Sequence, residues 1–401
     1  MNKINDMKKT SFPNFEFNLR TKTKFGVGEA LNLGNYLKEL SFKKIGLILD
    51  PAISNLKYTK DILENIKKEE FEKVKVWVYN LKGEPDYDSL DKIKSLFLNK
   101  NSSPLVDCFV GIGGGSVIDF AKGLSTLLVN PGKAINYRGF PTNINPCLAT
   151  IAIPSTAGTG SEATFNAVFI DLNGKKKLGI NTKYNFPALA ILDPKLTLSC
   201  PKKVVVSSGI DTLVHCLEGY VAKNSTIFCR MFAKEGFKFM FNNLSKALQE
   251  PENIEIRMNL QLGAYLGGLA LLGSGGGPTG ALSYALGVHF KVPHGLAGGV
   301  FLPYIVEHNV KGGYDYGELC DVILGVSKSL DKRKKNQLFS KKLFQLWEKI
   351  GAPLSLKDFG VGRENVEIIF KEVENYEKAF EQNPTPFLVE DGKKLLLKLI
   401  K

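Results

Sequence analysis

Residues 111–119 read GIGGGSVID and join a short apolar run, residues 105–112 (LVDCFVGI), to a segment with a helical pattern. Glycine has no Cβ, so its backbone can approach a pyrophosphate closely, and free N–H groups at a helix start attract an anion. A tight turn without a ligand has the same composition, but phosphate-binding turns require this strand and helix context. We therefore expect phosphate binding by Gly113, Gly114, Gly115 and Ser116, with Ser116 also capping the helix.

Strands and helices alternate around this turn. Short β-rich runs occupy residues 44–50, 73–79, 148–153, 163–170 and 188–193, and a helical pattern covers residues 58–68. This alternation predicts parallel strands joined by crossover helices. After residue 194 the pattern changes to long helical segments such as 228–249 and 341–350. We predict an α/β domain, residues 1–195, followed by an all-helical domain, residues 196–401, with a ligand-binding cleft between them.

Two other polar features belong to the predicted sheet. Asp50 ends its first strand, where a carboxylate can accept hydrogen bonds from a ribose diol and repel the 2′-phosphate of NADP. Asp50 also precedes Pro51, so it can equally be a turn-initiating residue. Residues 154–162 (PSTAGTGSE) follow another strand and offer hydroxyls and N–H groups to the same ligand, unless they form an ordinary polar loop.

The composition is that of a large folded protein with reduced thiols. The chain has 401 residues, 44% of them hydrophobic, and its six cysteines show no paired CxxC spacing. Residues 1–17 (MNKINDMKKTSFPNFEF) contain no apolar run of the kind found in a signal peptide. These observations predict a cytoplasmic protein.

The charge distribution restricts the partners. No charged residue lies between Arg257 and Lys291, a length that would span a bilayer, but residues 273–278 (GSGGGP) interrupt it, so we expect two buried helices and no membrane partner. The net charge of +13 indicates either a solvated surface or attraction of an anionic substrate. The lysines are not gathered with aromatics into one stripe, which disfavours nucleic acid.

Three residues form a candidate metal site. Asp211 and His215 are four apart on a predicted helix, so their side chains project from one face and can chelate one divalent ion. A helix-capping aspartate and a packed histidine explain that pair equally well. His294, between Pro293 and Gly295, would add a third ligand, and three ligands on Zn²⁺ or Fe²⁺ leave a position open for substrate. Of the other histidines, His289 either contributes to this site or caps a loop.

A set of motifs then resembles the iron-containing (group III) alcohol dehydrogenase family. In chain order the motifs are residues 25–28 (FGVG), 113–119 (GGGSVID), 155–162 (STAGTGSE), 191–194 (ILDP), 209–220 (GIDTLVHCLEGY), 293–295 (PHG) and 383–384 (NP). The resemblance covers nearly the whole chain. It implies an N-terminal dinucleotide-binding domain and a C-terminal helical domain, the fold shared with dehydroquinate synthases, with NAD(P) and a divalent metal in the cleft.

The same resemblance implies roles for single residues. It places Gly114, Gly115 and Ser116 on the pyrophosphate and Asp119 near the cofactor, and it adds Thr156, Thr159 and Lys177, the last near the nicotinamide ribose. Asp50 falls where the family discriminates NAD from NADP, and we expect NAD. One departure concerns the metal: the family's fourth protein ligand is a histidine, and the corresponding residue here is Gly280. A second family histidine corresponds to Tyr284.

These features predict a metal-dependent oxidoreductase that interconverts a primary alcohol and an aldehyde by hydride transfer. Tyr284 would relay a proton or bind the substrate, unless it is a packing residue. The substrate is either acidic or phosphorylated, as the net charge suggests, or a small neutral alcohol. The alternatives are a lyase similar to dehydroquinate synthase and a metal-free binding protein. A homodimer is expected from the family alone.

Overall fold

The computed structural model describes residues 14–81, 83–325 and 330–400. The prediction that residues 1–17 are not a signal peptide falls mostly outside the described residues, since residues 1–13 are not among them. The core of the first half is a six-stranded sheet with the order β1-β8-β5-β4-β2-β3, in which all neighbouring strands are parallel. Its strands are β1 (Lys22–Phe25), β2 (Lys44–Leu49), β3 (Lys73–Val78), β4 (Cys108–Gly113), β5 (Ala149–Pro154) and β8 (Leu189–Leu192).

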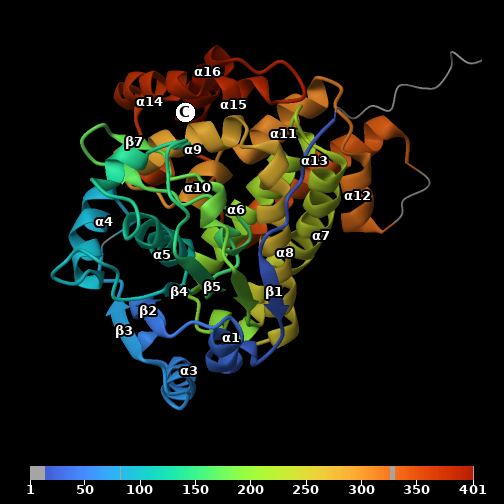
Figure 1. Ribbon diagram of the computed structural model, residues 1–401. Coiled ribbons are helices and arrows are strands. Elements are labelled where there is room, and N and C mark those ends of the chain that lie inside the picture. Colours follow the sequence, from blue (N-terminus) through green and yellow to red (C-terminus); the bar gives the residue numbers. More distant parts are fainter. Residues whose placement is uncertain (1–13, 82, 326–329, 401) are drawn as a thin grey trace, which may run out of the picture.

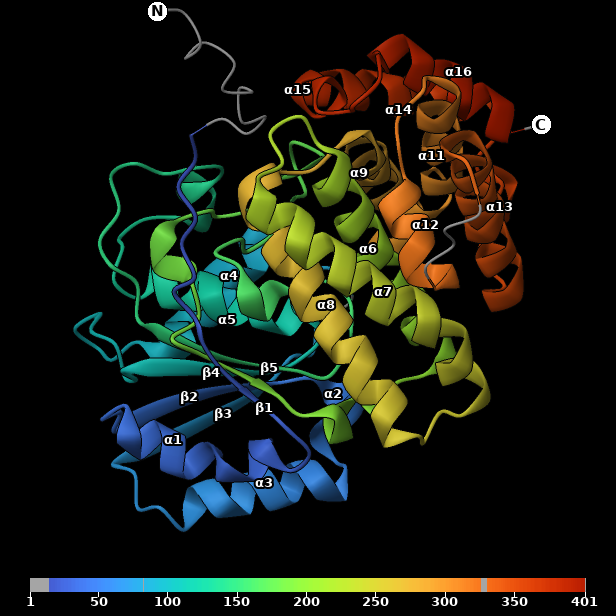
Figure 2. The same cartoon turned by 90° about the vertical axis from the view of Figure 1, so that its right-hand side faces the viewer.

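Helices cover both faces of this sheet (Figure 2). One face packs on α1 (Leu33–Glu39) and α3 (Lys57–Lys67), and the other on α4 (Tyr87–Lys94) and α5 (Gly115–Leu127). β4 and β2 are buried along their apolar residues because both faces are covered, as in other parallel sheets. The predicted parallel α/β architecture is confirmed.

The carboxyl ends of three central strands meet at one edge of the sheet. The N–H of Asp50, after β2, donates to the Ile112 carbonyl at 2.9 Å, and the N–H of Ser155 donates to the Gly113 carbonyl at 2.9 Å. The glycine turn therefore lies between Asp50 and the loop that begins at Ser155. Ligands of open parallel sheets bind at this edge.

From Lys202 onward the described residues form helices and connecting turns (Figure 1). Three long helices, α6 (Lys202–Val221), α7 (Ile227–Gln249) and α8 (Ile254–Ser274), share one apolar core with later helices. A second core surrounds α9 (Pro278–Phe290) and α10 (His294–Gly299). The remaining helices are α11 (Leu302–Lys311), α12 (Gly317–Leu324), α13 (Lys332–Ile350), α14 (Val366–Val373), α15 (Glu377–Glu381) and α16 (Val389–Leu399).

The uncharged stretch between Arg257 and Lys291 forms α8, a short loop and α9, as predicted. In the part of the chain that the structure describes, no helix combines the length and apolarity needed to cross a bilayer. The six cysteines are all free thiols.

One predicted strand is wrong, and one strand of the six-stranded sheet was missed. Residues 161–163 form a 3-10 turn, and only the last residue of the predicted strand at 163–170 is in a strand, the hairpin pair β6 (Ile170–Asp171) and β7 (Lys176–Lys177). The backbone of this segment bonds partly to side chains of α5 and partly to the residues after β7, where the Ala167 and Phe169 carbonyls accept the N–H groups of Ile180 and Leu178. The missed strand is β1, whose sequence KTKF has little apolar content.

The loop at residues 155–162 touches both halves of the molecule. A Cβ at Gly158 would lie 2.6 Å from Ser208 Cβ on α6, and one at Gly160 would lie 2.5 Å from Gly268 Cα on α8. Thr212 of α6 also donates a hydrogen bond to the Gly158 carbonyl at 3.0 Å. Side chains at these two glycines would push the helices away from the loop.

We predict that Gly160→Ala lowers the free energy of unfolding by about 2–4 kcal/mol. An alanine is strained in the left-handed backbone conformation of residue 160, and overpacking against α8 adds about 1–3 kcal/mol to that strain. Gly360→Ala is the matched control: its φ of 70° resembles the 63° of Gly160, but its Cβ would meet no atom within 4 Å. Calorimetric melting at one scan rate compares the two variants. Equal losses in both would contradict a packing role for Gly160.

Candidate functional site

A cavity of about 570 Å³ lies between the carboxyl edge of the sheet and the helices that follow it. Its wall includes Gly115, Ser116 and Thr159 from the first half. From the second half it includes Asp211, His215 and His294. One cavity thus joins the predicted phosphate turn to the predicted metal cluster.

The surroundings explain differently why each of the three positions 113, 114 and 115 is glycine. A Cβ at Gly113 would lie 2.7 Å from Val117 Cγ2, and one at Gly115 would lie 2.6 Å from Thr159, so both glycines are required by packing. At Gly114 the nearest atoms belong to Thr156, at 3.6 Å. Gly114 therefore presents the most open backbone of the turn.

Ser116 does not cap the helix, contrary to the prediction. Helix α5 begins at Gly115, and its N-cap is Gly114, which makes no side-chain capping bond. The helix starts two residues earlier than a Ser116 cap would place it, because the extended backbone of Gly114 leads directly into it. The Ser116 hydroxyl is left to face the cavity.

Asp50 initiates a turn, one of the two roles considered for it. Its Oδ1 accepts the Ala52 N–H at 2.9 Å and caps the short helix α2 (Pro51–Ser54). Its Oδ2 lies 3.5 Å from the Gly114 N–H. The carboxylate thus starts a turn and at the same time stands beside the glycine turn.

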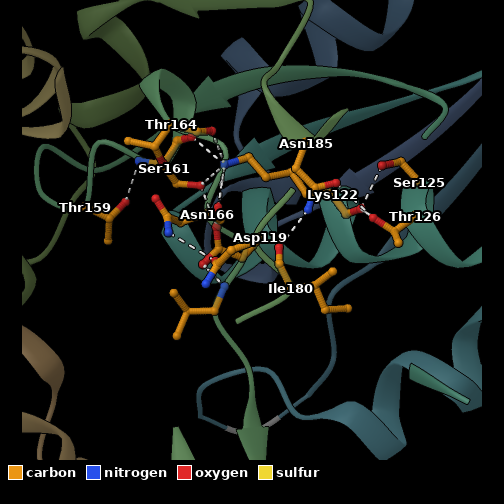
Figure 3. Close-up of polar contacts among 12 residues, drawn as sticks. Asp119, Lys122, Ser125, Thr126, Thr159, Ser161, Thr164, Asn166, Ile180 and Asn185 are labelled. Atoms are coloured by element: carbon orange, nitrogen blue, oxygen red, sulfur yellow. Dashed lines mark hydrogen bonds and ion pairs between the residues drawn. The ribbon is translucent and has the colours of Figure 1, made fainter. Parts of the chain in front are cut away.

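A buried lysine holds the loop that forms part of the cavity wall. The Lys122 side chain is fully buried, and its Nζ donates to the carbonyls of Ser161, Thr164 and Asn166 at 2.6, 2.9 and 2.8 Å (Figure 3). A fourth contact reaches Ser161 Oγ at 2.9 Å. These bonds satisfy carbonyls of the loop that are not in a strand.

Asp119 holds the same loop from the preceding turn of α5. Its carboxylate accepts the Ser161 hydroxyl at 2.5 Å and the Val168 N–H at 3.0 Å, and lies 3.9 Å from Lys122 Nζ. Burial raises the pKa of Asp119, with Lys122 opposing this shift. Burial lowers the pKa of Lys122 to about 8, with Asp119 opposing, so the ammonium is still charged at neutral pH.

The predicted metal ligands come together. His215 Nε2 lies 3.5 Å and His294 Nε2 3.8 Å from Asp211 Oδ1, and one ligand atom from each residue lies within 4.8 Å of the other two. Asp211 and His215 lie about one turn apart on the same face of α6, and His294 is the first residue of α10. Among the described residues, this is the one group of three or more His, Cys, Asp or Glu side chains with such spacing.

The donor set fits a divalent ion. A tetrahedral ion about 2.0–2.2 Å from each ligand holds the ligands roughly 3.4 Å apart, close to the spacing observed. Burial lowers the pKa of His294 to about 3, helped by Lys177, so its imidazole is neutral and can donate a lone pair. Ser283 Oγ lies 3.2 Å from His294 Nδ1 and orients the ring with Nε2 toward Asp211.

Gly280, where a fourth ligand was expected, stands beside a buried glutamate. A Cβ at Gly280 would meet Glu218 Oε2 at 3.5 Å. Glu218 accepts the N–H groups of Gly277 at 2.8 Å, Thr279 at 2.6 Å and Gly280 at 3.3 Å. This carboxylate therefore caps the start of α9, and its oxygens are committed to backbone donors.

Tyr284 and Lys177 lie on the other side of the cluster. The Tyr284 ring stacks on His294 with 5.4 Å between ring centroids. Lys177 Nζ lies 5.6 Å from the Tyr284 ring centre and 2.7 Å from Glu84 Oε1. Burial opposes the charge of Lys177, but the ion pair with Glu84 outweighs burial and raises its pKa.

His289 is not brought to the cluster. It lies near the C-terminus of α9, beside Phe290, and does not line the cavity. His308 Nε2, on α11, donates to the Pro386 carbonyl at 2.8 Å. Both histidines are thus separate from Asp211, His215 and His294.

Several site residues were not identified from the sequence. Glu218 follows His215 by three residues on α6, so the helical spacing that identified Asp211 also pointed to it. Lys122 interrupts an otherwise apolar helix, a signal of a buried charge with partners. Glu84 lies in a loop after β3 and carried no local signal, because only the fold brings it to Lys177.

The fold joins a dinucleotide-type α/β half to a helical half, with one cavity between them. Two family models match: "Iron-containing alcohol dehydrogenase" over residues 20–194, and "Fe-containing alcohol dehydrogenase family, C-terminal" over residues 205–400. The chain belongs to the iron-containing alcohol dehydrogenase family. It is an alcohol dehydrogenase that interconverts alcohols and aldehydes.

Individual relatives cover most of the chain. An NAD-dependent methanol dehydrogenase of Bacillus methanolicus is 28% identical over 86% of this chain and 90% of its own length. A long-chain-alcohol dehydrogenase of Geobacillus thermodenitrificans is 29% identical over 88% and 89%, respectively. The solved alcohol dehydrogenase of Oenococcus oeni has a TM-score of 0.87 and 26% identity, and the match covers 96% of this chain and 100% of that one. These matches do not favour a lyase or a degenerate binding protein.

We predict that Lys122→Met destabilises the protein by about 3–5 kcal/mol, because it leaves three buried carbonyls and Asp119 without their cation. Lys203→Met, on the exposed surface of α6, is the control, with a change within about 0.5 kcal/mol. Thermal melting of both variants measures the effect. Equal melting temperatures would mean that the Lys122 cage contributes no net stability.

Proposed function

We propose that this chain catalyses NAD-dependent interconversion of a primary alcohol and an aldehyde in the cavity between its two halves. The observation that carries the proposal is the single cavity that joins the glycine turn to the Asp211, His215 and His294 cluster. In this proposal residues 1–195 form the domain that binds NAD, and residues 196–401 form the domain that binds metal and substrate. Hydride transfer requires both ligands in one enclosed space.

The cofactor would lie along the carboxyl edge of the sheet. Gly113, Gly114, Gly115 and Ser116 would bind the pyrophosphate, since the turn presents its backbone and one hydroxyl at the N-terminus of α5. Thr156 and Thr159 flank the turn from the second loop. Lys177 would face the nicotinamide ribose, and Asp119 acts through the loop that it holds. Asp50 would favour NAD over NADP by repelling a 2′-phosphate.

The metal would be Fe²⁺ or Zn²⁺ held by Asp211, His215 and His294. Bound there, the ion supplies Lewis-acid polarisation of the substrate oxygen, and NAD supplies the hydride acceptor. The Tyr284 ring stacks on His294. Its hydroxyl would bind the substrate or relay a proton. Burial raises the pKa of Tyr284, so this hydroxyl is protonated at neutral pH and can donate a hydrogen bond. We assign no role to His289.

The cavity supports a neutral substrate. The net charge of +13 suggested an acidic or phosphorylated substrate, but Lys177, which lines the cavity, already pairs with Glu84. Among the described residues that line the cavity there is no other lysine and no arginine to bind an anionic group. The free thiols support a cytoplasmic location, and a homodimer is proposed on the family resemblance, with no nucleic-acid or membrane partner.

We predict that His294→Ala weakens metal binding at least about 100-fold and abolishes turnover, because two ligands remain. His308→Ala, far from the cluster, keeps both properties. Metal content after loading with Fe²⁺ or Zn²⁺ is measured by elemental analysis, and turnover by NADH absorbance. Unchanged metal content in His294→Ala would overturn the assignment of the metal site.

We predict that Asp50→Asn reduces the preference for NAD over NADP about tenfold, the effect of roughly 1–2 kcal/mol of like-charge repulsion. Asparagine keeps an oxygen for the Ala52 N–H, so the α2 cap is preserved. Asp331→Asn makes the same change at the N-cap of α13 and serves as the control. The measurement is kcat/KM for each cofactor, and an unchanged ratio in Asp50→Asn would exclude this role.

A further inference from the structure

Glycines form the part of the cavity wall that joins α8 to α9. Gly275, Gly276 and Gly280 all line the cavity. A Cβ at Gly276 would meet no atom within 4 Å, and one at Gly280 would meet only Glu218 Oε2, at 3.5 Å. Gly277, between them, is different, because its Cβ would lie 2.7 Å from Glu218 Oε1. Packing therefore requires glycine at 277 but not at 276 or 280.

Backbone conformation does not require these two glycines either. Of Gly275, Gly276 and Gly280, only Gly275 has a positive φ, 70°. Gly280 lies within α9, where glycine is a poorer helix former than every residue except proline. A side chain is thus absent at 276 and 280 although the fold tolerates one, and the space left empty belongs to the cavity.

This empty space runs from the metal cluster to the surface. The Gly280 carbonyl accepts the Ser283 hydroxyl at 2.6 Å, and the same Ser283 Oγ lies 3.2 Å from the ligand His294. Gly275 and Gly276, at the other end, are exposed to solvent. The α8 part of the wall contributes the apolar Leu271 and Leu272, and Ser274, whose hydroxyl bonds to backbone carbonyls. Glu218 adds few free hydrogen-bond acceptors to this wall, because its oxygens already accept backbone N–H groups.

We propose that Gly280 and Gly276 form a channel, free of side chains, that accepts the aliphatic chain of a long primary alcohol or aldehyde. The inference rests on the proposed function and specifies its substrate class. A neutral, extended chain fits this channel, since its reacting end would lie at the cluster and its tail would pass Gly280 and leave at Gly276. Each methylene buried along the apolar wall raises kcat/KM roughly three- to fourfold.

The test compares 1-hexanol with ethanol as substrates of the metal-loaded enzyme. The wild type is expected to prefer 1-hexanol, and Gly276→Leu to reduce the ratio of kcat/KM for 1-hexanol over ethanol at least about tenfold, because a side chain blocks the exit. Gly280→Ala narrows the inner end and is expected to reduce the ratio in the same direction. Metal content of each variant is measured alongside.

The control is Gly287→Ala, a second glycine within α9 whose Cβ would meet only the Val292 carbonyl, at 3.8 Å, and which does not line the cavity. Its ratio should equal that of the wild type. A wild type that prefers ethanol, or a ratio unchanged in Gly276→Leu and Gly280→Ala, overturns the channel and leaves the proposed function standing. Absence of NAD-linked turnover with every alcohol and aldehyde overturns both.

Discussion

The close contact between the loop at residues 155–162 and the long helices is the constraint on which the site depends. The cavity takes one wall from the sheet and the other from the helices, so its shape is defined only if the two halves hold a fixed distance. Gly158 and Gly160 bring the loop into contact with α6 and α8, where backbone meets backbone. A rigid seam of this kind places the glycine turn and the metal ligands in one space.

Buried charged groups then hold each part of the site by its backbone. Lys122 collects the carbonyls of the loop that follows the seam, Asp119 takes a hydroxyl and an N–H of the same loop, and Glu218 takes three N–H groups at the start of α9. Charge-assisted hydrogen bonds are about twice as strong as neutral ones, so they suit segments with no regular ladder. The residues that line the cavity are therefore mostly positioned by residues behind them.

Local patterns in the sequence were sufficient for most of the elements and for the residues of the candidate metal cluster, which the fold brings together. Helical spacing identified Asp211 and His215, and the glycine turn was located between its strand and its helix. The sequence could not show why the loop at 163–170 is not a strand, because its apolar and β-branched residues are typical of one. The outcome depends on Lys122 and Asp119, which lie about 40 residues earlier in the chain. The separation of His289 from the cluster likewise depends on the direction of α9, which only the tertiary structure determines.

Replacement of the expected fourth metal ligand by Gly280 has little effect on the architecture around it, and the reason is Glu218. If the start of α9 were held mainly by a histidine on the metal, loss of that ligand would free the helix. Here Glu218, on the same helix as Asp211 and His215, binds the first N–H groups of α9 directly. Ser283 and Tyr284, one turn further along, contact His294 directly. The start of α9 thus has a protein anchor that does not involve a side chain at residue 280, which can shape the cavity instead.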